Sequence, residues 1–500
     1  MTEILLGFET AFTATNLLYC LIGVTLGTVI GMLPGLGSAS GVGLLLPLTF
    51  GLEPVTAIIM LAGIYYGAQY GGTISSVLIG APGEAATAVT VLEGHQMARR
   101  GRAGQALAIA AIASFVAGVL SLVVVMFVSP LLANVALQFG PPEMVAVILL
   151  ALVATVGFTA GGRTKGLLCL GLGLVVATVG IDPVLGTERF TFGRIELLGG
   201  LGFIEVVIGV FAIAEILRNV SARHSPQVAR PSWGEMMLSK NDLKVSTAPI
   251  VRGSGIGTVM GVVPGAGSTL ASFASYGVER TVAKGKGFGK GAIQGVAGPE
   301  AANNAGANGS FIPTLSLGIP GSATTAVLLG ALTLHGIQPG PLLIEQQPVL
   351  VWGVLASFLI GNAILLILNL PLAPLFASVL TVPYKRLYPV ILAVCIIGAY
   401  AVENSMTGVW VAVAFGIVGY FLQKYDYPLL PLILGLILGP MLEQGLAQSV
   451  QMGGGSYAIF ADRPLALVFL ALTALALVLP PVVRGIRSRR TRSADKLVSR

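Results

Sequence analysis

The sequence predicts an all-α polytopic membrane protein, built from two inverted-topology repeats with discontinuous helices or re-entrant hairpins. Composition is the first observation behind this prediction: 10 % of the 500 residues are charged and 55 % are hydrophobic, whereas soluble domains carry about 25 % charged residues. The second is a series of apolar runs, and the third is an internal repeat of glycine-rich motifs. Because one spanning helix takes about 20 residues, the chain has room for roughly ten to thirteen membrane segments.

The apolar runs, interrupted by glycine, proline and charge, give the expected positions of the membrane segments. Some of these runs are too short to span a bilayer alone. The segments cover residues 14–33, 38–51, 55–80, 104–129, 142–160, 164–181 and 199–217, and then 250–263, 267–279, 292–317, 320–336, 348–370, 386–402, 405–422, 427–443 and 463–483.

Basic clusters and polar stretches divide the chain into expected domains. We assign the basic clusters to the cytoplasm, because cytoplasmic loops carry an excess of Lys and Arg. The N-terminus lacks a basic region, so no cleavable signal peptide is expected. The division is a first membrane repeat (14–217), a cytoplasmic linker (218–248), a second membrane repeat (249–445), a C-terminal transmembrane helix (446–483) and a basic cytoplasmic tail (484–500).

Two pairs of motifs reveal the internal repeat. GVTLGTVIGMLPGLGSAS (23–40) and GSGIGTVMGVVPGAGSTL (253–270) match at nine of eighteen positions, with an offset of 230. GAPGEAATAV (80–89) and GIPGSATTAV (318–327) match at seven of ten, with an offset of 238. Basic residues follow the second motif in the first copy but surround the first motif in the second copy. Inverted-topology repeats would place charge in this complementary way.

Each first motif combines a glycine ladder with a helix break. Glycines four apart lie on one helix face, where they allow close packing, and the ladder runs into Pro-Gly-x-Gly-Ser. Proline disrupts a helix and glycine permits unusual backbone angles. We therefore expect two discontinuous helices or helical hairpins with their tips near the membrane midplane, where broken backbone requires surrounding protein or water.

These breaks are the predicted binding site. The half-helix that starts after a break offers free N–H groups to an anionic carboxylate, and the half that ends before it offers carbonyls to Na⁺. Helix capping and helix-to-helix hydrogen bonding are the alternative roles of the hydroxyls and amides. The predicted substrate-binding residues are Gly35, Gly37, Ser38, Gly83, Gly265, Gly267, Ser268, Thr269, Asn304, Gly321, Ser322 and Thr324, and the predicted ion-binding residues are Pro34, Thr73, Pro264, Asn303 and Asn308.

The motifs strongly resemble the large membrane subunit of tripartite tricarboxylate transporters, the TctA type. The stretches that carry the resemblance include TLGTVIGMLPGLGS, YYGAQYGGTISSVLIGAPGE, GTVMGVVPGAGSTLASFASYGVE, PEAANNAGANGSFIPTLSLGIPGSATTAVLLGALTLHGIQPGP and GHQMARRGRAGQAL, and it covers nearly the whole chain. Glu93 stands where the family pattern leads us to expect Asp.

The resemblance implies a multi-pass permease of the bacterial cytoplasmic membrane, with its C-terminus in the cytoplasm. It implies two partners, a small four-helix membrane subunit and a periplasmic substrate-binding protein, besides the lipid bilayer and the organic-acid substrate. Uptake of tricarboxylates, dicarboxylates or related organic acids would be driven by a Na⁺ or H⁺ gradient. Alternating access of an elevator-like kind is expected from the hairpin tips.

Other functions have weaker support in the sequence. A passive organic-anion channel and a membrane-embedded enzyme are the alternatives, but the chain lacks HExxH, GxSxG and phosphate-loop motifs, so no enzyme activity is predicted. Cys20, Cys169 and Cys395 are expected to be core residues. No cofactor, other metal or nucleic-acid partner is expected, apart from bound Na⁺ if that is the coupling ion. Glu205 is a candidate proton carrier or subunit contact.

Overall fold

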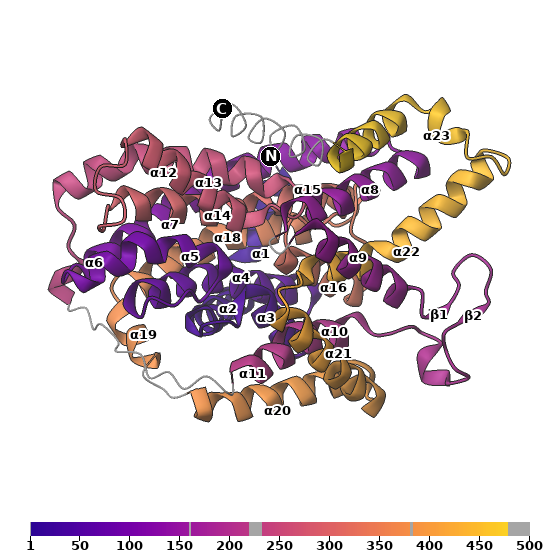
Figure 1. Ribbon diagram of the computed structural model, residues 1–500, viewed down its shortest axis with the longest axis horizontal. Helices are drawn as coiled ribbons and strands as arrows, with labels where there is room; N and C mark the ends of the chain where they lie inside the picture. The colour runs from indigo at the N-terminus through magenta and orange to yellow at the C-terminus, as the bar shows by residue number, and fades with distance from the viewer. Residues whose placement is uncertain (1, 160–161, 220–232, 381–383, 479–500) are drawn as a thin grey trace, which may run out of the picture.

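The computed structural model describes residues 2–159, 162–219, 233–380 and 384–478 (Figure 1). The predicted basic tail and the middle of the predicted linker lie outside these residues. The chain starts with α1 (Thr2–Ala11), α2 (Ala14–Met32), α3 (Gly37–Leu45), α4 (Pro54–Leu78), α5 (Ala88–Thr90), α6 (Gln96–Arg99), α7 (Ala103–Ala136), α8 (Pro141–Phe158), α9 (Arg163–Ala177), the strands β1 (Gly180–Ile181) and β2 (Glu188–Arg189), α10 (Phe203–Val207) and α11 (Ala214–Asn219).

The remaining elements are short helical turns and the helices of the second half. Short 3-10 helices cover Leu46–Thr49, Ala85–Thr87, Ile195–Leu197 and Trp233–Met236, and π-helical turns cover Val91–His95 and Ile208–Ile213. The later helices are α12 (Lys240–Val262), α13 (Gly267–Val282), α14 (Gln294–Gly309), α15 (Phe311–Leu317), α16 (Ala323–Leu334), α17 (Leu343–Gln346), α18 (Pro348–Asn369), α19 (Ala373–Val379), α20 (Tyr384–Glu403), α21 (Met406–Lys424), α22 (Leu429–Met452), α23 (Ile459–Asp462) and a last helix, Pro464–Val478.

The predicted all-α membrane class is confirmed. Within the described residues β1 and β2 form the only sheet, a two-stranded antiparallel pair. Six described helices, α2, α7, α8, α18, α21 and α22, are long and apolar enough to cross a membrane. The large hydrophobic side chains that remain exposed along these helices fit a lipid-facing surface.

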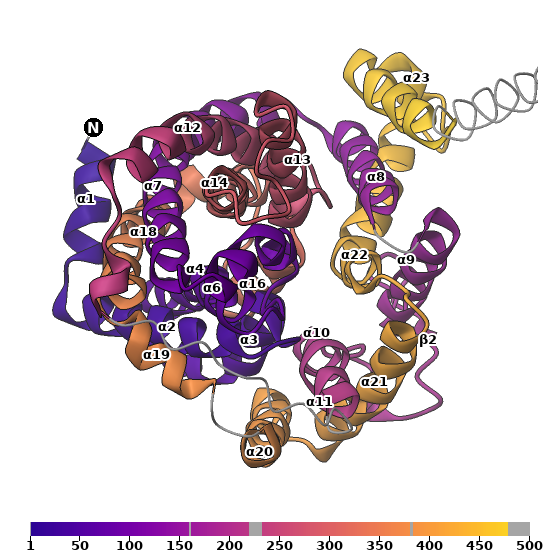
Figure 2. The same cartoon turned by 60° about the vertical axis from the view of Figure 1, so that its left-hand side comes forward.

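The helices form two groups (Figure 2). The first, which we call the core body, contains α1–α7 and α12–α18, with α14 packed between α7, α12 and α13. The second, the outer arc, contains α8–α11 and α20–α22, with α22 packed against α8 and α9. Each half of the chain therefore supplies its earlier helices to the core body and later helices to the outer arc.

The glycine ladders explain the tight packing inside the core body. In the first copy, the ladder of α2 lies against α4: a Cβ atom on Gly27 would come within 2.3 Å of the Ile64 carbonyl oxygen. In the second copy, the ladder of α12 lies against α14, and a Cβ on Gly257 would come within 2.4 Å of the Ala302 carbonyl oxygen. Equivalent ladder glycines thus allow equivalent helix pairs to approach, which supports the internal repeat in three dimensions.

Both predicted helix breaks are present. Gly35 and Gly265 adopt positive φ angles of 94° and 82°, a conformation that favours glycine. The second break turns the chain back on itself, because Arg252 of α12 and Glu279 of α13 form an ion pair with a 2.6 Å separation. The pair α12–α13 is therefore a helical hairpin, with its tip at residues 263–266.

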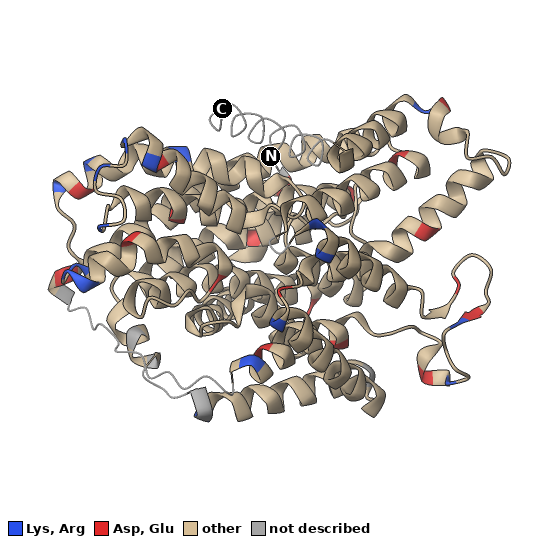
Figure 3. Cartoon of the chain, viewed as in Figure 1, with Lys and Arg blue, Asp and Glu red and all other residues tan. Residues whose placement is uncertain are grey.

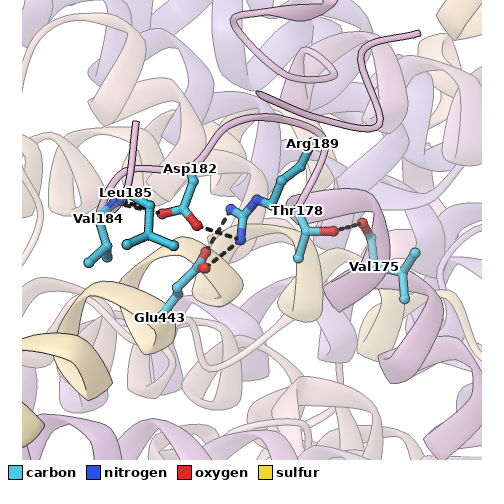
Figure 4. Close-up of polar contacts among 7 residues, drawn as sticks. All are labelled: Val175, Thr178, Asp182, Val184, Leu185, Arg189 and Glu443. Carbon is cyan, nitrogen blue, oxygen red and sulfur yellow. Dashed lines mark hydrogen bonds and ion pairs between the residues drawn. The ribbon is translucent and has the colours of Figure 1, made fainter. Parts of the chain in front are cut away.

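Polar segments depart most from the predicted map. Helix α12 begins at Lys240, inside the predicted linker, because Ser239 and Asp242 form a capping box that starts the helix before its apolar part. The hairpin β1–β2 was not predicted; it extends from the outer arc at the lower right of Figure 1. Arg189 fixes it to α22 through Glu443 at 2.6 Å, and Asp182 lies 3.4 Å from the same guanidinium group (Figure 4).

Candidate functional site

The four Pro-Gly motifs meet at one cavity of about 700 Å³. It lies where the core body faces the outer arc, since α11, α21 and α22 contribute to its wall. Its lining includes most of the predicted site residues: Pro34, Gly35, Gly37, Ser38, Gly83, Gly265, Gly267, Ser268, Thr269, Ser322 and Thr324. Residues that are far apart in the sequence are thus brought to one place.

Direct contacts connect the motifs of the two copies. The hydroxyl groups of Ser38 and Thr324 lie 2.7 Å apart, which joins the first motif of one copy to the second motif of the other. Within the second copy, the N–H of Gly265 donates to the carbonyl of Gly321 at 3.2 Å. Gly321 does not line the cavity itself, but this bond places it directly behind the hairpin tip.

The two helix N-termini at the cavity differ in charge. In the first copy, the Glu84 carboxylate accepts a 2.5 Å hydrogen bond from the Ser38 N–H, near the start of α3. The corresponding residue in the second copy is Ser322, whose hydroxyl instead accepts from the Thr325 N–H at 3.2 Å and caps α16. In the described part of the chain, no carboxylate caps the start of α13, where Ser268 and Thr269 line the cavity. The second copy thus presents the open positive helix end.

Charged side chains from the outer arc complete the cavity. Glu215 and Arg218 of α11 line it, and the Glu215 carboxylate accepts from the Asn219 side chain at 2.7 Å. Gly35 lies against Glu215, because a Cβ atom at this glycine would be 2.0 Å from the carboxylate oxygen. In the same way, Gly265 lies against Thr155 of α8. Each hairpin tip therefore touches the outer arc.

The predicted site omits several of these residues. Glu84 belongs to a motif that aligned well, but its partner in the alignment is an uncharged serine, so its charge carried no repeat signal. Arg218 was assigned to a cytoplasmic basic cluster. Tyr65 and Gln69 of α4 also line the cavity. The sequence YYGAQ (65–69) contains both residues, and such polar side chains in a membrane segment are a usable signal. The sequence did not indicate which helix face meets the cavity.

Five other predicted residues lie outside the cavity wall. The Thr73 hydroxyl donates to Glu300 at 2.7 Å, and the Asn308 amide donates to the Gly118 carbonyl at 2.9 Å. Asn304 donates to the backbone of its own helix at 3.3 Å. Asn303 is buried in the same helix, and Pro264 ends the first half of the hairpin. Their roles in binding stay predictions; in the structure, Thr73 and Asn308 make helix-to-helix hydrogen bonds.

The remaining candidate functional residue, Glu205, lies outside the cavity at the helix breaks. Glu205 is buried in the outer arc beside Gly202 and Gly408, away from the cavity lining. Across the described residues, no three His, Cys, Asp or Glu side chains gather as a metal site. The cavity is lined by apolar side chains such as Leu36 and Phe211, by hydroxyls, backbone and amides, and by three charged side chains: Glu84, Glu215 and Arg218.

Comparison with known proteins gives a consistent result. Residues 17–434 match the model of the family described as "Tripartite tricarboxylate transporter TctA family". The chain is 46 % identical over 491 residues, 98 % of both chains, to an "uncharacterized 52.8 kDa protein in TAR-I ttuC' 3'region" of Agrobacterium vitis. It is also 46 % identical over 236 residues, 47 % of this chain and 98 % of the relative, to an "uncharacterized protein in TAR-II ttuC' 3'region" of the same organism. No solved structure matches the chain.

Proposed function

Because the chain belongs to the tripartite tricarboxylate transporter TctA family, we propose that it is the permease that moves organic acids through such a transporter. The substrates are tricarboxylates, dicarboxylates or related organic acids, taken up across the bacterial cytoplasmic membrane. The partners are a small four-helix membrane subunit and a periplasmic binding protein, and the C-terminus lies in the cytoplasm. The multi-pass helical architecture supports this assignment.

The single observation that carries the proposal is the meeting of four chain breaks at one cavity. Broken helices expose backbone N–H and carbonyl groups, which are the ligand-binding groups of many secondary transporters. The cavity also lies between the core body and the outer arc. A ligand there contacts both groups of helices, so movement of one group past the other would carry the ligand across the membrane.

We place a substrate carboxylate at the start of α13. Its first-turn residues Ser268 and Thr269 supply hydroxyl groups, and the helix end supplies partial positive charge. Arg218, which lines the same cavity, supplies a full positive charge for a second carboxylate. The start of α3 is the poorer anion site, because Glu84 already places a negative charge there.

A Na⁺ or H⁺ gradient would drive the uptake. The carbonyl-rich breaks at Pro34 and Pro264 are the proposed cation ligands. Support for further ligands comes from buried side-chain oxygen atoms without hydrogen-bond partners in the described part of the chain, on Gln69, Asn304 and Asn308. Gln69 also lines the cavity. No other metal or cofactor is proposed.

Uptake of labelled citrate and a labelled dicarboxylate into proteoliposomes tests the function, with the small subunit and the binding protein present. We expect uptake that needs the ion gradient, and a loss of about tenfold in the Ser268→Ala variant, because it removes a hydrogen bond to a charged ligand. Ser246→Ala is the matched control, because Ser246 is equally small and buried but does not line the cavity.

The same assay distinguishes the proposed transporter from a channel. Flux that ignores both the ion gradient and the binding protein would contradict secondary transport and support a passive pore. If Ser38→Ala and Ser268→Ala both leave uptake unchanged, the cavity is not the substrate site.

A further inference from the structure

A second cavity, of about 480 Å³, is lined by several basic residues at one end of the molecule. Figure 3 shows Lys and Arg residues gathered at this left-hand end. The cavity shares no residue with the cavity at the helix breaks. It is lined by Arg100, Arg102, Asn241, Asp242, Val245, Lys286, Gly287, Lys290, Gly291, Ala292, Ile293 and Gln294.

Positive charge dominates the lining of this basic cavity. Four cationic side chains, Arg100, Arg102, Lys286 and Lys290, face one acidic residue, Asp242. Arg102 pairs with that aspartate at 3.0 Å. Within the described residues no ion pair is formed by the other three cations. The cavity therefore carries an excess of three positive charges.

The loop that carries two of these lysines is held in place by a buried carboxylate. Glu93 is fully buried and accepts hydrogen bonds from the N–H groups of Gly291 at 2.8 Å and Ala292 at 2.9 Å. It also accepts from the N–H of Gly289 and from the Tyr276 hydroxyl. Lys286 and Lys290 are thus presented from a loop whose backbone is fixed, so the site needs little ordering before it binds a ligand.

The start of helix α14 also borders the basic cavity, next to the N–H groups that Glu93 binds. Helix α14 begins at Gln294 after its N-cap residue Ile293, and both line the cavity. The first N–H groups of this helix are already used, because Gly295 and Val296 donate to the carbonyls of Ala292 and Ile293. The positive potential of the cavity therefore comes from its basic side chains. A phosphate group matches these basic side chains, because it has up to two negative charges and several acceptor oxygens, which suit guanidinium and ammonium donors together.

We propose that the basic cavity binds a phosphate group, distinct from the transported acid. The two copies and the start of α12 all contribute to it, so an occupied site would tie these elements together. The phosphate could belong to an anionic lipid headgroup, which basic clusters at a membrane surface attract, or to a soluble phosphate. The experiment has one arm for each source.

The purified full-length chain in a neutral detergent is titrated with inorganic phosphate by calorimetry. In the second arm it is placed in nanodiscs with phosphatidylglycerol or phosphatidylcholine, and retained lipid is measured by native mass spectrometry. We expect the Lys286→Gln/Lys290→Gln variant to weaken binding at least about tenfold in the arm that shows it, since each basic residue near a lipid surface contributes about fivefold. Lys284→Gln is the matched control, because Lys284 lies in the same exposed loop but does not line the cavity.

Binding in the first arm identifies a soluble phosphate, and selective retention of phosphatidylglycerol identifies a lipid headgroup. Arg100→Gln repeats the test at a residue outside the loop that carries the two lysines. A loss of binding in this variant therefore cannot result from collapse of that loop. The proposal is overturned if neither probe binds, if citrate binds and phosphate does not, or if Lys284→Gln weakens binding as much as the double variant. The result does not depend on whether the chain transports organic acids.

Discussion

At the scale of single residues, Glu84 and Ser322 determine how the two copies differ. They occupy equivalent positions after the second Pro-Gly motif, yet Glu84 bonds the start of α3 and Ser322 caps α16. One helix end is thereby neutralised by the chain itself, and the corresponding end of α13 remains available to a ligand. One of the three differences between these ten-residue motifs therefore makes the two helix ends at the cavity unequal in charge.

Arg218 provides the residue-scale prediction. We expect Arg218→Gln to raise the KM for a tricarboxylate about tenfold, because it removes a charge-assisted interaction with one carboxylate. Uptake kinetics in proteoliposomes measure the change. Arg99→Gln is the matched control, since Arg99 is exposed and lines neither cavity. An unchanged KM in the Arg218 variant would remove this residue from the substrate site.

At the scale of elements, the helical hairpins depend on backbone approach rather than on side-chain fit. In α12, the ladder face rests against α14, whereas Gly255 on the same helix has open space where a Cβ would be added. The helix therefore carries glycines of two kinds, those that admit a neighbouring helix and those that only weaken the helix.

The pair Gly257→Ala and Gly255→Ala separates these two kinds. Gly257→Ala should lower the free energy of unfolding by about 1–3 kcal/mol, because the new methyl group overpacks the contact with α14. Gly255→Ala should be neutral or stabilising by up to about 1 kcal/mol, because alanine favours the helix. Denaturant unfolding in detergent measures both. Equal effects of the two substitutions would show that α12 does not pack as described.

The hairpin β1–β2 gives an element-scale prediction about pH. The pKa of Asp182 is lowered by hydrogen bonds from the Leu185 and Val184 N–H groups and by nearby Arg189. A carboxyl group whose pKa is lower in the folded state contributes stability above its ordinary value of about 4, and this stability is lost as pH falls through the lower folded value.

Local hydrogen exchange of the hairpin, corrected for the intrinsic effect of pH, checks this dependence. We expect protection of residues 180–189 to fall as the pH is lowered below about 4. In Asp182→Asn the hairpin should be less protected near neutral pH and should lose this titration. A wild-type hairpin with constant corrected protection would contradict the role of the carboxylate.

At the scale of the whole molecule, the division into core body and outer arc is the feature most relevant to transport. Both helix breaks touch the outer arc, Gly35 at Glu215 and Gly265 at Thr155, and the cavity at the breaks lies along the same boundary. An elevator-like motion would slide one group along this boundary. That the two copies cross the membrane in opposite directions stays a prediction, which accessibility labelling near Arg100 and Gly340 would test.

A cross-link tests the sliding motion. A Cβ atom on Gly43 of α3 would lie 3.9 Å from the Cβ of Val207 in α10, within the range of about 3.5–4.5 Å that a disulfide needs. In a background without the three native cysteines, the Gly43→Cys/Val207→Cys variant should stop uptake when oxidised and recover when reduced. The single variants under the same oxidant are the controls. Full uptake by the cross-linked protein would contradict movement at this boundary.

Much of the architecture was predictable from local patterns. Apolar runs located the long helices closely, because hydrophobic length reflects the thickness of a bilayer. The start of α12 and the hairpin β1–β2 were not located, because capping residues and polar loops leave no hydrophobic signal. Most of the predicted site residues line the cavity at the helix breaks, whereas Thr73 bonds a neighbouring helix and Asn304 bonds the backbone of its own helix.

The sequence by itself determined the membrane class, the internal repeat, the family and the places where helices break. Composition, motif spacing and the chemistry of proline and glycine reveal these features. Such properties act within a few residues and can be read without the tertiary structure. Only the tertiary structure decided that the breaks meet at one cavity, that Glu84 occupies one helix end, and that Arg218 of the outer arc lines the same cavity. Such relations depend on which faces of distant helices pack together, and helix packing is settled by contacts between residues far apart in the chain.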